Sequence, residues 1–476
     1  MNVALENNAY SFVDICHKHF GRKVIYTNAT EINGNNVVDE LNKALKLHWH
    51  NRKEIEYLEK YYLGQQPILA RAKHVRPEIN NKIVENHAFE IVEHKVADLF
   101  GEPIQYVFKG DNQELSQNLN SLNDILEEQS KEEVDIAMGR WQSICGTSYR
   151  YVWTDKASEY PFEFCSENPK STFVVYSADS GHKPMFSVQQ RKDTDNTDFY
   201  FVYTTTATYK VKKNVVVDSG TNGYFAIPII EYPNNERRLS DIEIVITMLD
   251  AINKEQSDRI NGVEQFVASI IKFVNCDIEE DEFLRLIQIG MLKVKNPQGG
   301  TADVEMMSNE LDQENTQISK EDLYNNILIV EGMPSREKNT GGDTGSAVYM
   351  RNGFEFSERR AELKEPTFKK SERKFIRLML EMLRKSGKDT GLSVGNIEIK
   401  ILRSKTDNMS VKANVLILLL QAGIHPKIAI KVCNLFSDSE LVYLESKKYL
   451  DVKYLTEQQA SEQSAEELKD TLLASK

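Results

Sequence analysis

The sequence predicts an α+β fold, with a β-rich first half and a mainly helical second half. Between residues 147 and 212, five short segments alternate polar residues with aromatic and β-branched ones. From Ser240 onward, apolar residues recur at helical spacing instead. A single β-type segment, NIEIKILRS (396–404), then stands among the helices. Segregated strands and helices of this kind are typical of α+β architecture.

Length and composition limit the class of protein. The chain has 476 residues, 40% hydrophobic and 28% charged, as in globular proteins built from several compact units. Its net charge is −13, so contact with nucleic acid should be confined to local cationic segments. The five scattered cysteines form no CxxC pair and fit a reducing compartment. No signal peptide is visible, and the longest apolar run, Val415 to Leu420, is too short for a membrane span, so we expect cytoplasmic assembly and no membrane contact.

The first half should begin with helices and continue as a sheet. Helices are predicted over 39–61, 78–99 and 114–138, with the strand PIQYVF between the last two. The five β-type segments are TSYRYVWT, STFVVYS, MFSVQQR, FYFVYTT and TYKVKK, separated by turns such as ADSGHKP. Residues 1–239 are therefore predicted to form one α+β domain.

Two helices should then bracket a small insertion. Ser240 and Glu243 form a capping-box signature ahead of a helix predicted over 240–274, which is polar on a wide face. Residues 277–282 hold five acids in six positions, and MLKVK and ADVEMM flank NPQGG as a predicted hairpin. A second helix follows at 314–331. An insertion whose ends rejoin an antiparallel helix pair should protrude as a lobe on a stalk.

A Gly-rich loop and a long basic helix come next. The loop PSREKNTGGDTGS (334–346) should be mobile, and the helix over 346–386 should be kinked or broken at Pro366. Residues 346–390 carry twelve Lys/Arg against seven Asp/Glu. These cations could pair with acids such as Glu355 and Glu381 one turn away, or could in part face DNA.

The C-terminal region should be helical and end in a polar tail. VKANVLILLLQAG and PKIAIKVCNLF are predicted to form two helices separated at Gly423-Ile-His-Pro426. From residue 451 the chain is acidic and rich in Gln, Ser and Glu, so it should fray.

Candidate chemical motifs do not support catalysis. Gly341–Ser346 lacks the lysine that a phosphate-binding loop requires. His48 and His50 are two positions apart and would face different directions on a helix, so packing or surface roles are favoured over metal binding. We expect no catalytic residue, no cofactor and no metal site.

The order of these parts resembles the portal proteins of long-tailed bacteriophages of Gram-positive hosts. The likeness spans about residues 40–450 and lies in three stretches: YYLGQQPILAR with RPEINNKIVENHAFEIVEHKVADLFGEPIQY, IPIIEYPNNERRLSDIEIVITMLDAINKEQSDRINGVEQF, and GMPSREKNTGGDTGSAVYMRNG. The resemblance implies a dodecameric ring around a DNA channel at the capsid vertex, active in DNA packaging and ejection. It also implies a portal-type subunit with an α+β wing, helical stem, small α/β clip, long tunnel helix and helical crown.

The resemblance also assigns ranges to these parts. The wing would be 1–239 with the return strand 396–404, the stem 240–274 and 313–333, and the clip 275–312. The tunnel loop would be 334–346, the tunnel helix 347–388, the crown 405–450 and the acidic tail 451–476.

It further implies candidate contact residues and partners. DNA-channel candidates are Arg336, Lys338, Asn339, Thr340, Gly341, Gly342, Asp343 and Thr344, which would touch double-stranded DNA without sequence preference. Candidates for docking at the clip are Asp277, Glu279, Glu280, Asp281, Glu282, Lys293 and Lys295. The partners would be further copies of the chain, the terminase large subunit, a head-completion or connector protein, and the major capsid and scaffolding proteins.

Two other classes of function remain as alternatives. A nucleotide-driven packaging motor would need a phosphate-binding loop and an acidic pair at the end of an apolar strand, and neither is visible. A helical capsid-associated scaffold or adaptor would differ in size, because a portal forms a ring. The expected location is the virion, after assembly in the host cytoplasm.

Overall fold

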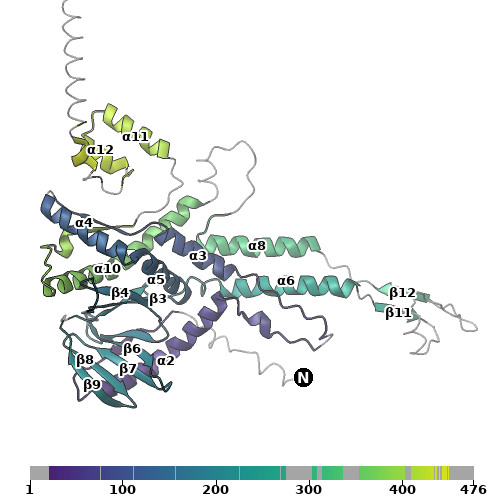
Figure 1. Cartoon of the computed structure of the whole chain (residues 1–476). Helices are drawn as coiled ribbons and strands as arrows, with labels where there is room; N and C mark the ends of the chain where they lie inside the picture. Colours follow the sequence, from purple (N-terminus) through teal and green to yellow (C-terminus); the bar gives the residue numbers. More distant parts are fainter. Residues whose placement is uncertain are drawn as a thin grey trace, which may run out of the picture.

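A computed structural model gives the fold of the chain. It describes residues 21–74, 77–110, 112–155, 157–223, 226–267, 270–274, 303–307, 313–335, 353–401, 409–433, 435–436, 439, 442–447 and 449. A mixed α/β body carries a pair of long helices that project from one side and a helical unit that lies apart from it (Figure 1).

Helices dominate the first part of the body. They are α2 (Val37–Tyr62), the short 3-10 helix η1 (Pro67–Ala70), α3 (His87–Phe100), α4 (Gln113–Glu128) and α5 (Lys131–Cys145). Leu41, Ala44, Ile55 and Leu58 form the buried stripe of α2 at helical spacing. The helix predicted over 78–99 begins only at His87, where Asn86 caps it by accepting from the Phe89 amide. The helix predicted over 114–138 is two helices, because Ser130 adopts a left-handed φ of 53°.

A six-stranded sheet forms the lower part of the body. Its order is β1-β5-β6-β7-β8-β9, with only β1 and β5 parallel. The strands are β1 (Ile25–Thr27), β5 (Thr172–Ser177), β6 (Pro184–Lys192), β7 (Asp198–Tyr203), β8 (Ala207–Lys212) and β9 (Val215–Thr221). Leu41 and Ala44 of α2 belong to the same buried cluster as Phe173 and Val188 of this sheet. The predicted β-rich character of residues 147–212 is therefore confirmed.

Two smaller sheets connect the halves of the chain. One has the order β10-β3-β4, with β3 at Thr147–Trp153, β4 at Glu163–Glu167 and β10 at Ile229–Pro233. In the other, β2 (Gln105–Phe108) pairs antiparallel with β13 (Ile397–Lys400), which follows the 3-10 helix η2 (Val394–Asn396). The strand predicted at 396–404 is thus present, and it returns to the first half of the chain.

The long basic helix is α10 (Phe354–Lys385), and it continues through Pro366 without a break. Of the kink or break predicted at this proline, the break is therefore wrong. On the C-terminal side of Pro366, Phe368, Phe375 and Ile376 are buried in the body core. Their packing stabilises the helix after the proline. Of the pairs predicted along this helix, Glu381 and Lys385 lie 3.8 Å apart.

The projecting pair consists of α6 (Ile246–Val267) and α8 (Gln313–Glu331). The helix predicted over 240–274 is shorter at both ends, because residues 241–245 form turns and Ile270–Val274 form strand β11. The predicted strand in ADVEMM is present as β12 (Asp303–Met307), and its partner in the described part of the chain is β11. These two strands lie at the far end of the helix pair (Figure 1).

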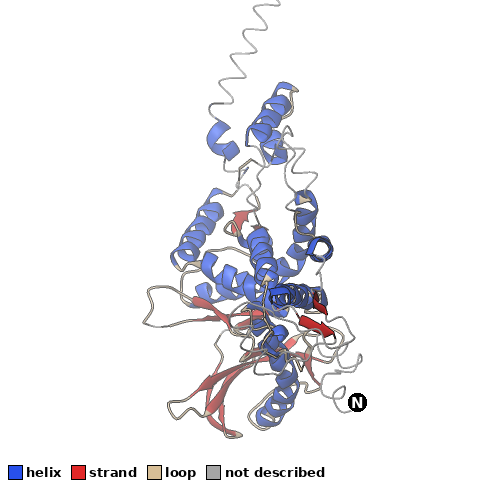
Figure 2. Cartoon of the chain, turned by 90° about the vertical axis from the view of Figure 1, so that its right-hand side faces the viewer, coloured by secondary structure: helices blue, strands red, loops and turns tan. Residues whose placement is uncertain are grey.

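The helical unit at the C-terminal side contains α11 (Met409–Gln421) and α12 (Pro426–Cys433), as the sequence predicts. In both views it lies beyond the body helices, on the side opposite the six-stranded sheet (Figures 1 and 2). Gly423 makes the turn between the two helices with φ 80°.

Candidate functional site

The antiparallel pair α6 and α8 is joined along its length by polar side chains. Arg259 donates to Gln317 over 2.5 Å, and Ser319 donates to Glu255 over 2.9 Å. Residue numbers in the paired positions decrease along α6 as they increase along α8, so the two helices are antiparallel. The contact is therefore polar near its middle and apolar near its base, where Leu249, Ile252, Ile327 and Leu328 are buried.

An extended segment of the body fixes the middle of α6. Alternate backbone N–H groups of this segment donate to side chains spaced four residues apart on one face of α6: Asn81 to Asn261 (2.7 Å), Ile83 to Ser257 (2.9 Å) and Glu85 to Asn253 (2.8 Å). Four residues of extended chain span about 13 Å, and eight residues of helix span about 12 Å. The two spacings match, so three bonds form in register.

A second anchor lies where α8 ends. The ammonium of Lys95 in α3 donates to the backbone carbonyl of Glu331 and lies 3.6 Å from its carboxylate. Glu331 is nearly fully buried. Burial and the neighbouring Asp241 carboxylate raise the pKa of Glu331 to about 7.

Asp241 ties the turn before α6 to α10. Its two carboxylate oxygens accept from Lys364 over 2.8 and 2.9 Å, and Ser143 and Asn234 also donate to them. Burial alone would raise the pKa of Asp241, but Lys364 and Lys95 leave it below its usual value. The start of α6, the end of α8 and the middle of α10 therefore meet at one ionic cluster of Lys95, Asp241, Glu331 and Lys364.

The chain leaves α8 in a defined direction. The amides of Gly332 and Met333 donate back to Ile329 and Leu328 over 3.1 and 2.8 Å, a helix ending that needs the left-handed φ of 64° at Gly332. Arg360 of α10 donates to the Val330 carbonyl and lies against Gly332. The end of α8, next to the segment that begins at 334, is thus held against α10.

A buried ionic network attaches α10 to the body. Glu372 accepts from Arg150 of β3 (3.1 Å), from Tyr232 of β10 (2.7 Å) and from Tyr106 of β2. Lys131 lies 3.0 Å from the same carboxylate. Burial opposes ionisation, but Arg150 and Lys131 outweigh it and lower the pKa of Glu372 to about 2.

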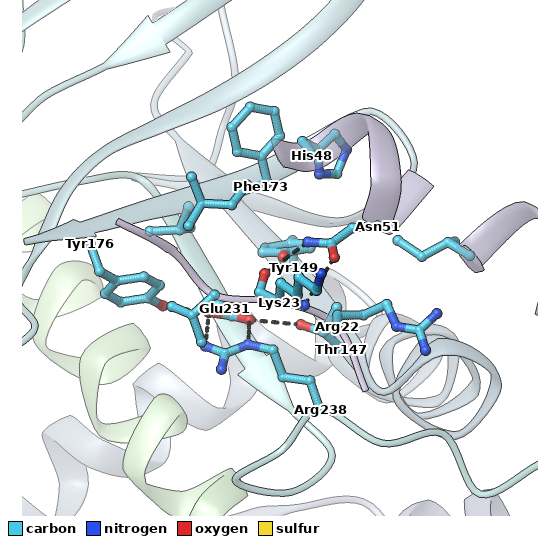
Figure 3. Close-up of a pocket in the computed structure, with 14 residues that line it drawn as sticks. Arg22, Lys23, His48, Asn51, Thr147, Tyr149, Phe173, Tyr176, Glu231 and Arg238 are labelled. Carbon is cyan, nitrogen blue, oxygen red and sulfur yellow. Dashed lines mark hydrogen bonds and ion pairs between the residues drawn. The ribbon is translucent and has the colours of Figure 1, made fainter. Parts of the chain in front are cut away.

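A second buried carboxylate, Glu231, organises the side of the body next to the first described residues (Figure 3). It accepts from Thr147 (3.0 Å), Tyr176 (2.5 Å) and the guanidinium of Arg238 (2.6 and 2.9 Å). Each of its two oxygens thus accepts from two donors of the protein. This arrangement holds β3, β5 and β10 together and gives the carboxylate a structural role.

Comparison with known proteins places the chain in a family. A family model described as phage portal protein, SPP1 Gp6-like, matches residues 41–471. The chain belongs to this family of phage portal proteins. The portal protein of Bacillus phage SPP1 is 23% identical over 418 residues, which cover 79% of this chain and 80% of that protein.

Solved structures of gene transfer agent particles also contain similar chains. One from the native virion has a TM-score of 0.41 at 12% identity and covers 78% of this chain and 89% of that chain. One from the neck of the empty particle has a TM-score of 0.42 at 12% identity and covers 71% and 86%.

The candidate contact residues for a portal lie outside the described residues. This holds for the eight loop candidates Arg336, Lys338, Asn339, Thr340, Gly341, Gly342, Asp343 and Thr344. It also holds for the seven clip candidates Asp277, Glu279, Glu280, Asp281, Glu282, Lys293 and Lys295. The structure does describe residues that flank these two segments. Val274 pairs with Asp303, which brings the two ends of segment 275–302 side by side.

Some anchoring residues of the portal subunit have signals in its sequence. Ser240 and Glu243 match the capping-box pattern, and Glu243 does accept from the Ser240 amide over 2.7 Å. Asn253, Ser257 and Asn261 repeat every fourth position, and a polar stripe within an amphipathic helix could have indicated them. Lys95, Glu331 and Glu372 carry no such signal, because their partners are more than a hundred residues away.

Three further observations concern metal binding and membrane contact. His48 is buried, lies 3.1 Å from the Lys170 carbonyl and stacks on Phe173, which is a packing role. Among the described residues, no three His, Cys, Asp or Glu side chains are grouped as metal ligands would be. In the same part of the chain, every helix is too short or too polar to cross a membrane.

Proposed function

We propose that the chain forms a closed ring of twelve copies at the capsid vertex, which conducts double-stranded DNA during packaging and ejection. The family match over residues 41–471 carries this proposal, because it includes every described element from α3 to α12 and most of α2. In this role the chain is a structural part of the virion, assembled in the host cytoplasm, with no catalytic step of its own.

The division into parts belongs to the same proposal. The body would be the wing (1–239 with 396–404), the region of α6 and α8 the stem (240–274 and 313–333), and residues 275–312 the clip. Residues 334–346 would form the tunnel loop, 347–388 the tunnel helix, 405–450 the crown and 451–476 an acidic tail. The antiparallel course of α6 and α8, and the β11–β12 pairing at their far end, support a stem that carries a small terminal lobe.

The clip would dock protein partners. Its acids, Asp277, Glu279, Glu280, Asp281 and Glu282, and its cations, Lys293 and Lys295, would contact the terminase large subunit and then a head-completion protein. The body and crown would face the major capsid and scaffolding proteins. Replacing residues 277–310 by a short Gly/Ser linker should leave rings intact and abolish packaging. Continued packaging would overturn the assignment.

The tunnel loop would touch DNA. The anchored ending of α8 at Gly332 and the contact of Arg360 with Val330 support a fixed root for such a loop. One lysine per chain becomes a circle of cations in a ring, which acts only where DNA passes within about 8 Å at physiological salt. Such contacts must be weak enough to exchange as DNA moves.

Loop variants test this part. Lys338→Ala should change the packaging rate or DNA retention and leave ring assembly unchanged, since an exposed cation contributes little to folding. Gly342→Pro should impair packaging more, if the loop must change its backbone conformation. Normal packaging in both variants would place the loop away from DNA, and loss of rings would make it a subunit contact.

The ring itself is tested by electron microscopy of negatively stained protein and by sedimentation. We expect particles of twelve 54.6 kDa chains with a central channel. A monodisperse monomer at micromolar concentration would overturn the proposal. ATP hydrolysis by the purified chain would favour the packaging-motor alternative, and a compact oligomer without a channel would favour a scaffold.

A further inference from the structure

The helical unit of α11 and α12 exposes an unusual amount of apolar surface. Residues Val415–Leu420 of α11 are six consecutive apolar residues, so they point to all sides of the helix. None of the described side chains of α11 is buried, and Ile417 and Leu418 are 50% and 61% exposed. A helix that is apolar all round is normally enclosed by other structure.

The second helix of the unit is two-sided. Ala429, Ile430 and Cys433 of α12 are buried, and α11 packs against α12. On the other side of α12, Ile428 and Val432 are 55% and 64% exposed and lie one turn apart. The unit therefore has one apolar outer surface on α11 and a different one on α12.

The described remainder of the chain leaves both surfaces open. Apart from each other, α11 and α12 have no extensive packing with any other labelled helix or strand, although Tyr443, in the helical residues that follow, contacts His425. The unit lies apart from the body helices in both views (Figures 1 and 2). A hairpin of a 13-residue and an 8-residue helix is also too small to enclose a core by itself.

We propose that the outer surface of α11 in one copy packs against the outer surface of α12 in the next copy around the ring. This inference rests on the proposed ring. In a closed ring every copy has two neighbours, and each contact joins two different surfaces of the same chain. Two distinct apolar surfaces on one small unit fit this arrangement, whereas one bound partner protein needs only one of them. The contact would form a continuous apolar belt of alternating α11 and α12 helices.

Charge substitutions test the contact. Leu418→Asp and Val432→Asp place a carboxylate at the proposed contact on opposite sides. Both side chains are exposed in a single copy, so the substitutions should cost little within one subunit. In the ring each should raise the concentration at which subunits dissociate by about tenfold or more, because a buried unpaired charge is costly. Gln421→Asp, at an exposed polar position of α11, is the matched control and should leave dissociation unchanged.

Cross-linking tests the direction of packing. The double variant Leu418→Cys/Val432→Cys, oxidised as rings, should give a ladder of covalent species larger than dimers on a non-reducing gel. Each single variant and the wild type, oxidised in parallel, control for the five cysteines that the chain already has, and none of them should give this ladder.

The outcomes separate this inference from the proposed function. If the wild type forms no ring, both fail. If rings form and the two Asp variants dissociate like Gln421→Asp, with no ladder in the double cysteine variant, only the α11–α12 contact is overturned. The contact is overturned in the same way if the Asp variants keep their rings but lose another virion protein, since the surfaces would then serve that partner.

Discussion

Lys95 contacts Glu331 at two points, because it donates to the backbone carbonyl while its ammonium lies 3.6 Å from the carboxylate of the same residue. The contact joins α3 to the end of α8, next to the pair of Asp241 and Lys364. The place where α8 ends and the predicted tunnel loop begins is therefore held by buried charge.

This cluster predicts a pH dependence. Folding raises the pKa of Glu331 from 4.5 to about 7. Between pH 4.5 and 7, the folded protein therefore keeps a proton on this carboxyl that the unfolded chain has lost. Stability from this residue is thus fully present below pH 4.5 and decreases as pH rises through 7. Chemical unfolding of Glu331→Gln from pH 5 to 8 should show a weaker decrease than the wild type. The pKa of Glu54 is also raised to about 7, but Glu54 is present in both proteins, so its effect is the same in both. Equal slopes of stability against pH in the variant and the wild type would contradict the prediction.

The network around Glu372 predicts a large loss of stability. Replacing Arg150 by Met leaves Glu372 and Asp135 buried with one cation fewer, and removing one partner of a buried pair typically costs about 3–5 kcal/mol. We expect a lower urea midpoint in Arg150→Met. The double variant Arg150→Met/Glu372→Gln should recover part of the loss, because the uncompensated charge is removed. An additive loss in the double variant would show that the two residues do not interact.

The ladder between the extended segment and α6 predicts a local effect. Ser257→Ala removes the acceptor of the Ile83 amide, which should lower the free energy of unfolding by about 1–2 kcal/mol. Hydrogen exchange at residues 81–85 should accelerate, while exchange in the six-stranded sheet stays the same. Lys254→Ala, on the exposed side of α6, is the control. Unchanged exchange at Ile83 would mean that its amide bonds elsewhere.

A glycine at the end of α5 predicts a steric effect. Gly146 has φ 82°, and a Cβ there would overlap the carbonyl oxygen of Arg238. The backbone conformation alone costs about 1–3 kcal/mol for another residue, and the clash adds to this. Gly146→Ala should therefore lower the melting temperature markedly. Gly223→Ala, where nothing lies within 4 Å, should have little effect.

Much of the fold was predictable because its signals are local. The alternating segments between 147 and 212 form strands, and 396–404 contains a strand, because period-two patterns identify half-buried strands. The capping box before α6 is visible in the same way. The family resemblance depends on the order of these elements, and the family match confirms it.

Other features depend on distant partners. Residues 78–86 have helical spacing, but their amides bond to α6 about 170 residues later, so the segment stays extended. The end of the helix predicted over 240–274 is β11, because Ile270–Val274 pairs with Asp303–Met307. The polar stripe on α6 has a periodic signal, but neither it nor a strand shows by its periodicity which remote segment is its partner.

The pairing of β13 with β2 has a consequence for biosynthesis. Strand β2 leaves the ribosome almost three hundred residues before its partner Ile397–Lys400, and Arg150 leaves it long before Glu372. A nascent chain that stops after α8 lacks both partners, so it exposes the edge of β2 and leaves Arg150 paired with Asp135 alone, without Glu372. Only a chain translated past β13 can complete its body, and shorter chains are therefore poor competitors for places in a capsid.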